Sequence, residues 1–324
     1  MGLPPKLLIQ AGRFAWTSMW KLMMGQMAPS DRRGDYQRPS SQFRQVLGSD
    51  FPAAFDRYTL IVGMGCPWAH RTLIARAVKR LEAVIDVEVV QPAPEEGGWI
   101  FASDAIGFRT VREFYLSIDP KYSGRCTVPI LWDRETHQIV NNESSEIIVM
   151  LNRGFSELAS GSDLYPDSLR GQIDAWNEEI YTAVNNGVYQ CGFAQTQAAY
   201  DQACDRLFAC LDKLEATLSR QRFLCGSALT LADIRLFPTL FRFDAVYYSL
   251  FKCSRQKISD YPALSAYARD IYQHPGVMET CSLEQVRQDY FGNLFPLNPG
   301  GIIPQGLDSQ DWLRPHDRAK LVAM

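Results

Sequence analysis

Residues 58–78 read YTLIVGMGCPWAHRTLIARAV, and this stretch predicts a strand followed at once by a helix. The run YTLIVG at 58–63 is short, apolar and rich in β-branched residues, which is typical of a buried strand. A helix is predicted directly after it, because Pro67 suits a first helical position and an apolar stripe at helical spacing follows. The alternating run DVEVVQP at 86–92 predicts a second strand. The unit is therefore a βαβ motif with parallel strands and a right-handed crossover.

The chain on either side of this motif predicts two domains of different class. The segments TVPILWD (127–133) and HQIV (137–140) indicate a hairpin, and a helix is expected over 142–152. This order of elements is that of the thioredoxin fold. Beyond about residue 165 the strand signals stop and helical periodicity takes over. It covers 168–188, 195–220, 230–251 and 261–274, the third of which opens on a capping box from Thr230 to Asp233.

We therefore expect an α+β protein, with a thioredoxin-like domain followed by an all-helical domain. The expected limits are an extension over 1–50, the thioredoxin-like domain over 51–157, the helical domain over 165–290 and a tail over 291–324.

Composition excludes several classes of protein. The 324 residues are 46% hydrophobic and 21% charged, and the formal charge of −3 does not favour a nucleic-acid partner. No apolar run is long enough to span a bilayer, so no membrane partner is expected. Residues 1–47 are basic, with seven Lys and Arg against two Asp. They are typical of an organellar address or of an extension that docks on its own domain or on a partner subunit; the location expected otherwise is cytoplasmic.

Eight cysteines are present at irregular spacing, and no C-x-x-C motif occurs. The four histidines do not pair into a ligand spacing, so neither a zinc site nor a disulfide framework is indicated, and a reducing compartment is expected. Most of these thiols are interpreted as small core residues. The GMG run at 63–65 does not predict a phosphate loop, because Trp68 stands where the third glycine of a dinucleotide motif belongs.

Cys66 is different because of its place at the junction of a strand and a helix start. The unpaired N–H groups and the dipole at a helix N-terminus favour an anion, so we expect a lowered thiol pKa and a nucleophilic thiolate. His70 and Arg71 are expected to add positive potential. Ala69 occupies the position of a second cysteine, so an external thiol must resolve a mixed disulfide on Cys66, and glutathione is the obvious candidate. A buried packing role for Cys66 is the competing interpretation.

Several stretches together resemble a known family, the glutathionyl-hydroquinone reductases, which form the Xi class of the glutathione transferase superfamily. The resemblance covers about residues 42 to 305. It rests on CPWAHR (66–71), GRCTVPILWD (124–133), NNESSEI (141–147), NNGVY (185–189), RFDAVY (242–247), FK (251–252) and DYF…NP (289–299). It implies the glutathione transferase architecture, glutathione as co-substrate and a homodimer. Relatives are often less glycine-rich just before the cysteine.

The resemblance also implies roles for individual residues. Cys66 matches the family's nucleophile. The glutathione site is implied to comprise Trp99, Val128, Pro129, Glu143 and Ser144, with Pro129 in a cis peptide bond. A carboxylate suits the ammonium group of the γ-glutamyl moiety, and a hydroxyl at a helix start suits its carboxylate. Glu143 can also act as a helix cap, and both roles can hold together.

Three tyrosines match the family's aromatic-acceptor site, namely Tyr189, Tyr247 and Tyr290. A phenol ring can stack on a quinone, and its hydroxyl can stabilise or protonate the ring that loses sulfur.

The function predicted on this basis is glutathione-dependent reduction of glutathionyl-hydroquinones to hydroquinones. It runs through a mixed disulfide between Cys66 and glutathione, releases GSSG and needs neither metal nor nucleotide. One alternative is a glutathione transferase that conjugates electrophiles, or a general thiol transferase with dehydroascorbate reductase activity. A non-catalytic binding module of the same fold is the other.

Overall fold

A five-stranded sheet, in the order β3-β2-β1-β4-β5, is the centre of the N-terminal domain. The structure is a computed structural model that describes residues 4–306 and 309–322. The strands are β1 (Tyr58–Gly63), β2 (Ile85–Ala93), β3 (Gly98–Phe101), β4 (Ile130–Asp133) and β5 (Gln138–Asn141). β1 pairs in parallel with β2 and antiparallel with β4, and β4 pairs antiparallel with β5. The predicted βαβ unit and hairpin are confirmed.

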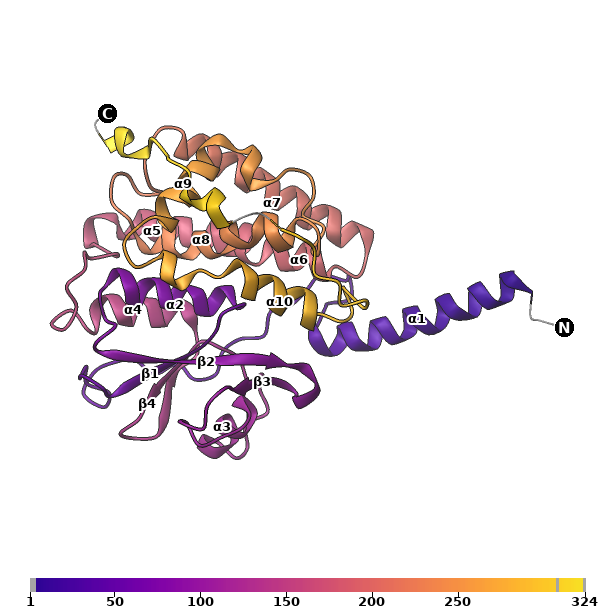
Figure 1. The fold of residues 1–324 in the computed structure, drawn as a ribbon, viewed down its shortest axis with the longest axis horizontal. Coiled ribbons are helices and arrows are strands. Elements are labelled where there is room, and N and C mark those ends of the chain that lie inside the picture. The colour runs from indigo at the N-terminus through magenta and orange to yellow at the C-terminus, as the bar shows by residue number, and fades with distance from the viewer. Residues whose placement is uncertain (1–3, 307–308, 323–324) are drawn as a thin grey trace.

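Three helices complete this domain: α2 (Pro67–Val78), α3 (Val111–Ile118) and α4 (Ser144–Arg153). Every residue of β1 is buried, and α2 is buried over most of its length because it lies between the sheet and the second domain. α2 packs against α4 and against α8 (Leu231–Arg242) of the helical domain, while α3 lies on the other side of the sheet (Figure 1). The start of α2 therefore faces the junction of the two domains.

The second domain is all-helical. Its α-helices are α5 (Arg170–Ile180), α6 (Gly187–Phe193), α7 (Gln197–Leu218), α8 (Leu231–Arg242), α9 (Pro262–Tyr272) and α10 (Leu283–Asn293), with π-helical turns at Tyr181–Asn185 and Phe243–Tyr247. The carboxylate of Asp233 accepts the Thr230 N–H at 2.8 Å, as the predicted capping box requires. The expected α+β class, a thioredoxin-like domain before a helical one, is confirmed; the exact domain limits stay predictions.

Some elements were not expected from the sequence. These are α1 (Pro5–Met27), β3, α10 and the 3₁₀ turns Pro94–Glu96, Asp167–Leu169, Ile258–Asp260, Met278–Thr280, Ser309–Leu313 and Arg318–Val322. The segment between α1 and β1, residues 28–57, carries no regular helix or strand but makes long-range bonds. Thr196 at the start of α7 donates its hydroxyl hydrogen to the carbonyl of Arg33 at 2.8 Å. Gln45 donates its N–H to Val140 in β5 at 2.9 Å.

We call residues 30–45 the arm. The arm touches both domains, so the expectation that the extension docks on its own domain holds for this part. It does not hold for most of α1, which projects away from the rest of the molecule in Figure 1. Residues 5–19 are all exposed, and contact with the body comes from the last two turns of the helix, around the fully buried Met24.

Candidate functional site

Cys66 is the N-cap residue of α2, with Pro67 at the first helical position as predicted. Its N–H bonds the carbonyl of Gly63 at the end of β1, at 3.0 Å. Its side chain is partly exposed, and its thiol lies 3.5 Å from the carbonyl oxygen of Val128, to which it donates. The strand end, the helix start and the loop before β4 thus meet at the sulfur.

The net shift of the Cys66 pKa is opposite to the one expected. Burial raises the pKa of this thiol, and the opposing effects are smaller. They come from the N–H groups of Ala69 and Trp68 at the helix start and from the positive charges of Arg38 and Arg242. The helix N-terminus therefore lowers the thiol pKa as predicted, but desolvation raises it by more.

His70 and Arg71 do not supply the positive potential that was expected of them. His70 is buried, and burial together with Arg242 holds its pKa well below the usual value, so the imidazole is neutral at pH 7. Arg71 is also buried, but its guanidinium reaches away to the helical domain, where it bonds Asn185 Oδ1 at 2.5 Å. The cations that act on the sulfur lie elsewhere in the chain.

Two residues of the helical domain hold the loop that precedes the cysteine. Arg242, at the end of α8, donates to the carbonyl of Gly65 at 3.0 Å and to that of Met64 at 2.9 Å. Asp289, on α10, accepts the Gly65 N–H at 2.8 Å. We call Arg242 and Asp289 the clamp. Both residues open stretches that carry the family resemblance, RFDAVY (242–247) and DYF…NP (289–299), but the sequence around Cys66 does not indicate that they bind its loop.

The clamp and one tryptophan explain the glycines of this loop. A Cβ on Gly65 would lie 2.3 Å from Asp289 Oδ2, and a Cβ on Gly63 would lie 2.5 Å from Cζ3 of Trp99. Both positions need close approach rather than a phosphate ligand, which agrees with the rejection of a dinucleotide loop. Trp99, on β3, is thereby placed against the strand end that leads to Cys66.

The other residues expected to bind glutathione border the same place. The peptide bond between Val128 and Pro129 is cis, as predicted. Glu143 is the N-cap of α4 and accepts the Ser145 N–H at 3.1 Å, so its capping role is confirmed. Burial raises the pKa of Glu143, but the Ser145 N–H, the charge of Arg38 and other hydrogen bonds lower it more, and the net shift is downward. Ser144 is buried beside it.

The three predicted tyrosines meet at their hydroxyl groups. The Tyr290 oxygen lies 2.6 Å from that of Tyr189 and 3.0 Å from that of Tyr247. Burial raises the pKa of all three phenols, so they stay protonated at neutral pH and keep their O–H donors. The Cys66 sulfur is close enough to influence Tyr189 and Tyr247 electrostatically, and the Trp68 ring, two residues from Cys66, stacks on that of Tyr189. Thiol and phenols therefore share one site.

The arm forms a wall of this site that was not predicted. The Arg38 guanidinium carbon stands 3.7 Å from the centroid of the Trp68 ring, and its charge acts on both Cys66 and Glu143. Tyr36 packs on Tyr189 with ring centroids 6.5 Å apart. Within the described residues, Arg38 has no hydrogen bond or ion pair with a protein acceptor, so its donors are available to a ligand. The basic charge of the arm was the available sequence signal.

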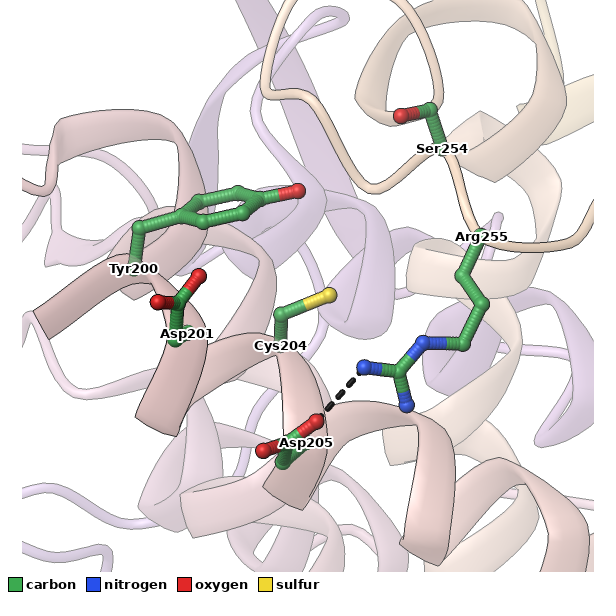
Figure 2. A pocket seen from close by; sticks show the side chains of 6 residues that line it. All are labelled: Tyr200, Asp201, Cys204, Asp205, Ser254 and Arg255. Carbon is green, nitrogen blue, oxygen red and sulfur yellow. Dashed lines mark hydrogen bonds and ion pairs between the residues drawn. The ribbon is translucent and has the colours of Figure 1, made fainter. Parts of the chain in front are cut away.

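Two hollows lie elsewhere on the surface. One, of about 460 Å³, is lined by Tyr200, Asp201, Cys204, Asp205, Ser254 and Arg255 (Figure 2). In it, Arg255 is paired with Asp205 at 2.6 Å, and burial raises the pKa of Cys204, so its thiol is poorly suited to attack. The other, of about 740 Å³, includes Cys281, whose pKa burial raises to about 12. Neither contains a predicted site residue.

No cluster of three or more His, Cys, Asp or Glu suited to a metal ion occurs within residues 4–306 and 309–322. All eight cysteines lie in this part of the chain and are free thiols. The arrangement thus places one free thiol near three protonated phenols.

Comparison with known proteins identifies the family. The profile for the N-terminal domain of glutathione S-transferases matches residues 65–153, and that for the C-terminal domain matches residues 197–270. The chain is 47% identical over 304 residues to "Glutathionyl-hydroquinone reductase YqjG" of Escherichia coli (strain K12), covering 88% of this chain and 92% of that protein. It is 45% identical to "Glutathionyl-hydroquinone reductase PcpF" of Sphingobium chlorophenolicum, covering 84% and 90%.

Solved structures agree with these sequence matches. The glutathione-bound structure of YqjG superposes with a TM-score of 0.83 at 46% identity and covers 86% of this chain and 96% of that one. The glutathione S-transferase Xi of Phanerochaete chrysosporium superposes with a TM-score of 0.85 at 43% identity, covering 89% and 97%. The resemblance seen in the sequence is confirmed, and the chain belongs to the glutathionyl-hydroquinone reductases, the Xi class of the glutathione S-transferase superfamily.

Proposed function

We propose that this protein reduces glutathionyl-hydroquinones to hydroquinones with glutathione as the reductant. The observation that carries the proposal is the meeting of the lone thiol of Cys66 with the hydroxyl cluster of Tyr189, Tyr247 and Tyr290. The relatives named glutathionyl-hydroquinone reductases support the same activity. A thiol beside an aromatic-acceptor site is what this chemistry needs, whereas conjugation of electrophiles needs a hydroxyl that stabilises glutathione.

The first step is attack on sulfur. The Cys66 thiolate forms an S–S bond with the glutathionyl sulfur, and the bond from that sulfur to the ring carbon breaks. The electron pair stays with the ring, and the ring carbon gains a proton. The tyrosine hydroxyls, protonated because burial raises their pKa, suit this role as donors near the ring. The hydroquinone leaves, and Cys66 remains bound to glutathione.

The second step resolves the mixed disulfide. Ala69 leaves no second cysteine in the first turn of α2, so the thiolate of a second glutathione attacks the sulfur of the bound one. GSSG leaves and the Cys66 thiolate is restored. The sum of both steps is one glutathionyl-hydroquinone plus one glutathione giving one hydroquinone plus one GSSG. No metal or nucleotide enters the balance.

Glutathione binding in this scheme uses the thioredoxin-like domain and the arm. Glu143 and Ser144 receive the γ-glutamyl end, and the backbone of Val128 next to the cis Pro129 receives the peptide part. Trp99 walls the site where it packs on Gly63. Arg38 offers unpaired donors to a carboxylate of the peptide, in the charge-assisted geometry that guanidinium groups favour.

The test is single turnover with a glutathionyl-hydroquinone, followed by mass spectrometry. Wild-type protein is expected to gain one glutathione on Cys66 and to release hydroquinone, and added glutathione then yields GSSG. The variant Cys66→Ala is expected to lose both signals, while the control Cys281→Ala keeps them. An unmodified Cys66 in wild type, or full turnover in Cys66→Ala, would contradict the proposal.

Further assays separate the alternatives. Conjugation of an aryl halide that survives Cys66→Ser would indicate an ordinary transferase, and thiol-dependent reduction of dehydroascorbate without hydroquinone release would indicate a general thiol transferase. A stable complex with another protein and no thiol activity would indicate a binding module. The homodimer and the cytoplasmic location implied at the sequence level stay predictions; sedimentation and fractionation measure them.

A further inference from the structure

Helix α1 presents apolar side chains to solvent along most of its length. It spans 23 residues, or about 34 Å at the helical rise, and it extends away from both domains (Figure 1). Its exposed large apolar residues are Leu7, Leu8, Ile9, Phe14, Trp16, Met19 and Leu22, with exposed fractions from 47% to 76%. An uncovered apolar surface of this kind marks an interaction site.

Five of the seven polar residues of α1 share one face of the helix, Ser18 and Gln26 lie off it, and all seven are neutral or basic. Helical spacing aligns Lys6, Gln10, Arg13, Thr17 and Lys21, which follow one another at intervals of three or four residues. No Asp or Glu occurs anywhere in the helix. A basic strip with Trp, Phe and Leu on the remaining faces is a feature of helices that lie in a membrane interface.

The attachment of α1 turns its apolar face outward. Met24, which the body buries completely, stands 18 residues after Lys6, which is about five turns of helix. The body therefore contacts α1 on the side that carries the basic strip. Leu8 and Leu22, on the opposite side, face away from the domains and are 54% and 65% exposed.

The charge and apolar surface of α1 favour a lipid surface over a second copy of the chain. Outside α1, large exposed apolar side chains of the described residues occur singly within helices and strands, or in loops. No one element of the body thus offers an apolar strip as long as α1, whereas a bilayer interface is continuous. None of the described helices is long and apolar enough to cross a bilayer, which leaves a parallel orientation on its surface.

We propose that α1 lies in the interface of an anionic membrane. The side of the helix that carries Leu8 and Leu22 contacts the acyl chains, and Lys6, Arg13 and Lys21 contact the headgroups. The expectation of no membrane partner rests on the lack of an apolar run that could span a bilayer, and a helix that lies on the surface needs no such run. The proposal is independent of the thiol chemistry. It concerns binding of phosphatidylserine-like headgroups by charge and of acyl chains by apolar contact.

The test is flotation of the full chain with vesicles of phosphatidylcholine and phosphatidylserine, and with phosphatidylcholine alone. Wild type is expected to float with the anionic vesicles and to detach as salt is raised. The triple variant Lys6→Gln, Arg13→Gln, Lys21→Gln is expected to bind about a hundredfold more weakly, since each basic residue near such a surface contributes about fivefold. The pair Leu8→Ser and Leu22→Ser is expected to lose at least tenfold.

A matched control removes three exposed cations from the body, Arg112→Gln, Lys121→Gln and Arg220→Gln, and is expected to bind like wild type. Sedimentation without lipid is run on every variant. No flotation of wild type, or equal losses in the control, would overturn the proposal. So would a dimer that the leucine variant dissociates in the absence of vesicle binding, because that result would assign α1 to a second copy of the chain.

Discussion

Two cations, Arg242 and Arg38, oppose the effect of burial on the pKa of the Cys66 thiol, and they differ in their hydrogen-bond partners. Arg242 is buried and donates hydrogen bonds to the carbonyls of Met64 and Gly65, so its charge is held in one place beside the thiol. Arg38 lies over the Trp68 ring without a protein acceptor and is carried by an arm outside the two domains. Arg38 is therefore the residue through which the arm influences the ionisation of the thiol.

The raised pKa of Cys66 and the charge of Arg38 together predict how alkylation of Cys66 depends on pH. Because burial raises the pKa of Cys66, the thiolate fraction at pH 7 is small, and alkylation by iodoacetamide should keep accelerating above the usual cysteine value of about 8.5. Arg38→Ala removes a positive charge that lowers the pKa of Cys66, so the midpoint of the pH–alkylation curve should move to higher pH. Arg38→Lys should reverse part of that shift, because it keeps the positive charge. Peptide mass spectrometry follows Cys66 alone. Arg33→Ala is the control, and an unchanged midpoint in Arg38→Ala would refute this role.

Tyr290 is the common partner of the two other phenols, which predicts a selective effect. Tyr290→Phe removes the hydroxyl that bonds Tyr189 and Tyr247, so the donors at the ring lose their alignment. The rate of hydroquinone release should fall about a hundredfold, within the range for loss of an acid catalyst. Alkylation of Cys66 should stay within twofold of wild type. Tyr248→Phe is the control, and an equal loss in both variants would contradict the assignment.

At the level of elements, strong local patterns predicted the fold and long-range contacts escaped prediction. The βαβ unit was readable because β1 and α2 each carry a clear apolar period. β3 was not, because four residues, GWIF, are too few to show one. The clamp residues Arg242 and Asp289 stand 177 and 224 residues from Gly65, beyond any sequence window. The sign of the Cys66 pKa shift was wrong for the same reason, because desolvation depends on what packs around the sulfur.

The clamp predicts that Gly65 tolerates no side chain. In Gly65→Ala the new Cβ would overlap Asp289 and break the hydrogen bond from the N–H of residue 65 to the Asp289 carboxylate. Overpacking together with the lost hydrogen bond should lower the free energy of unfolding by about 3 kcal/mol. Denaturant titration measures this. Gly171→Ala, in an exposed part of α5 with open space around it, is the control and should be neutral or stabilising by about 0.5–1 kcal/mol. Equal stability of the two variants would show that the loop adapts.

At the scale of the whole molecule, the site exists only where three parts of the chain meet. The thioredoxin-like domain supplies Cys66 and Glu143, the helical domain supplies the tyrosines and the clamp, and the arm closes the junction with Arg38. The arm also donates a hydrogen bond from Gln45 to Val140 in β5 and accepts one from Thr196 at the start of α7. It therefore links the two domains independently of the clamp. The basic N-terminal region thus divides into a part that completes the site and a helix that does not.

This division predicts unequal effects of two truncations. A chain that begins at Trp20 loses only exposed residues of α1, so its free energy of unfolding should stay within about 1 kcal/mol of wild type, and glutathione should bind unchanged. A chain that begins at Ser49 also loses Met24, Ala28 and Tyr36 from the core, and with them Arg38. It should lose about 3 kcal/mol or more, by cavity formation at the buried positions, and bind glutathione at least tenfold more weakly. Denaturant titration and calorimetry on both chains decide the matter. Should the longer truncation bind glutathione like wild type, the arm would be a structural tie between the domains and no part of the ligand site.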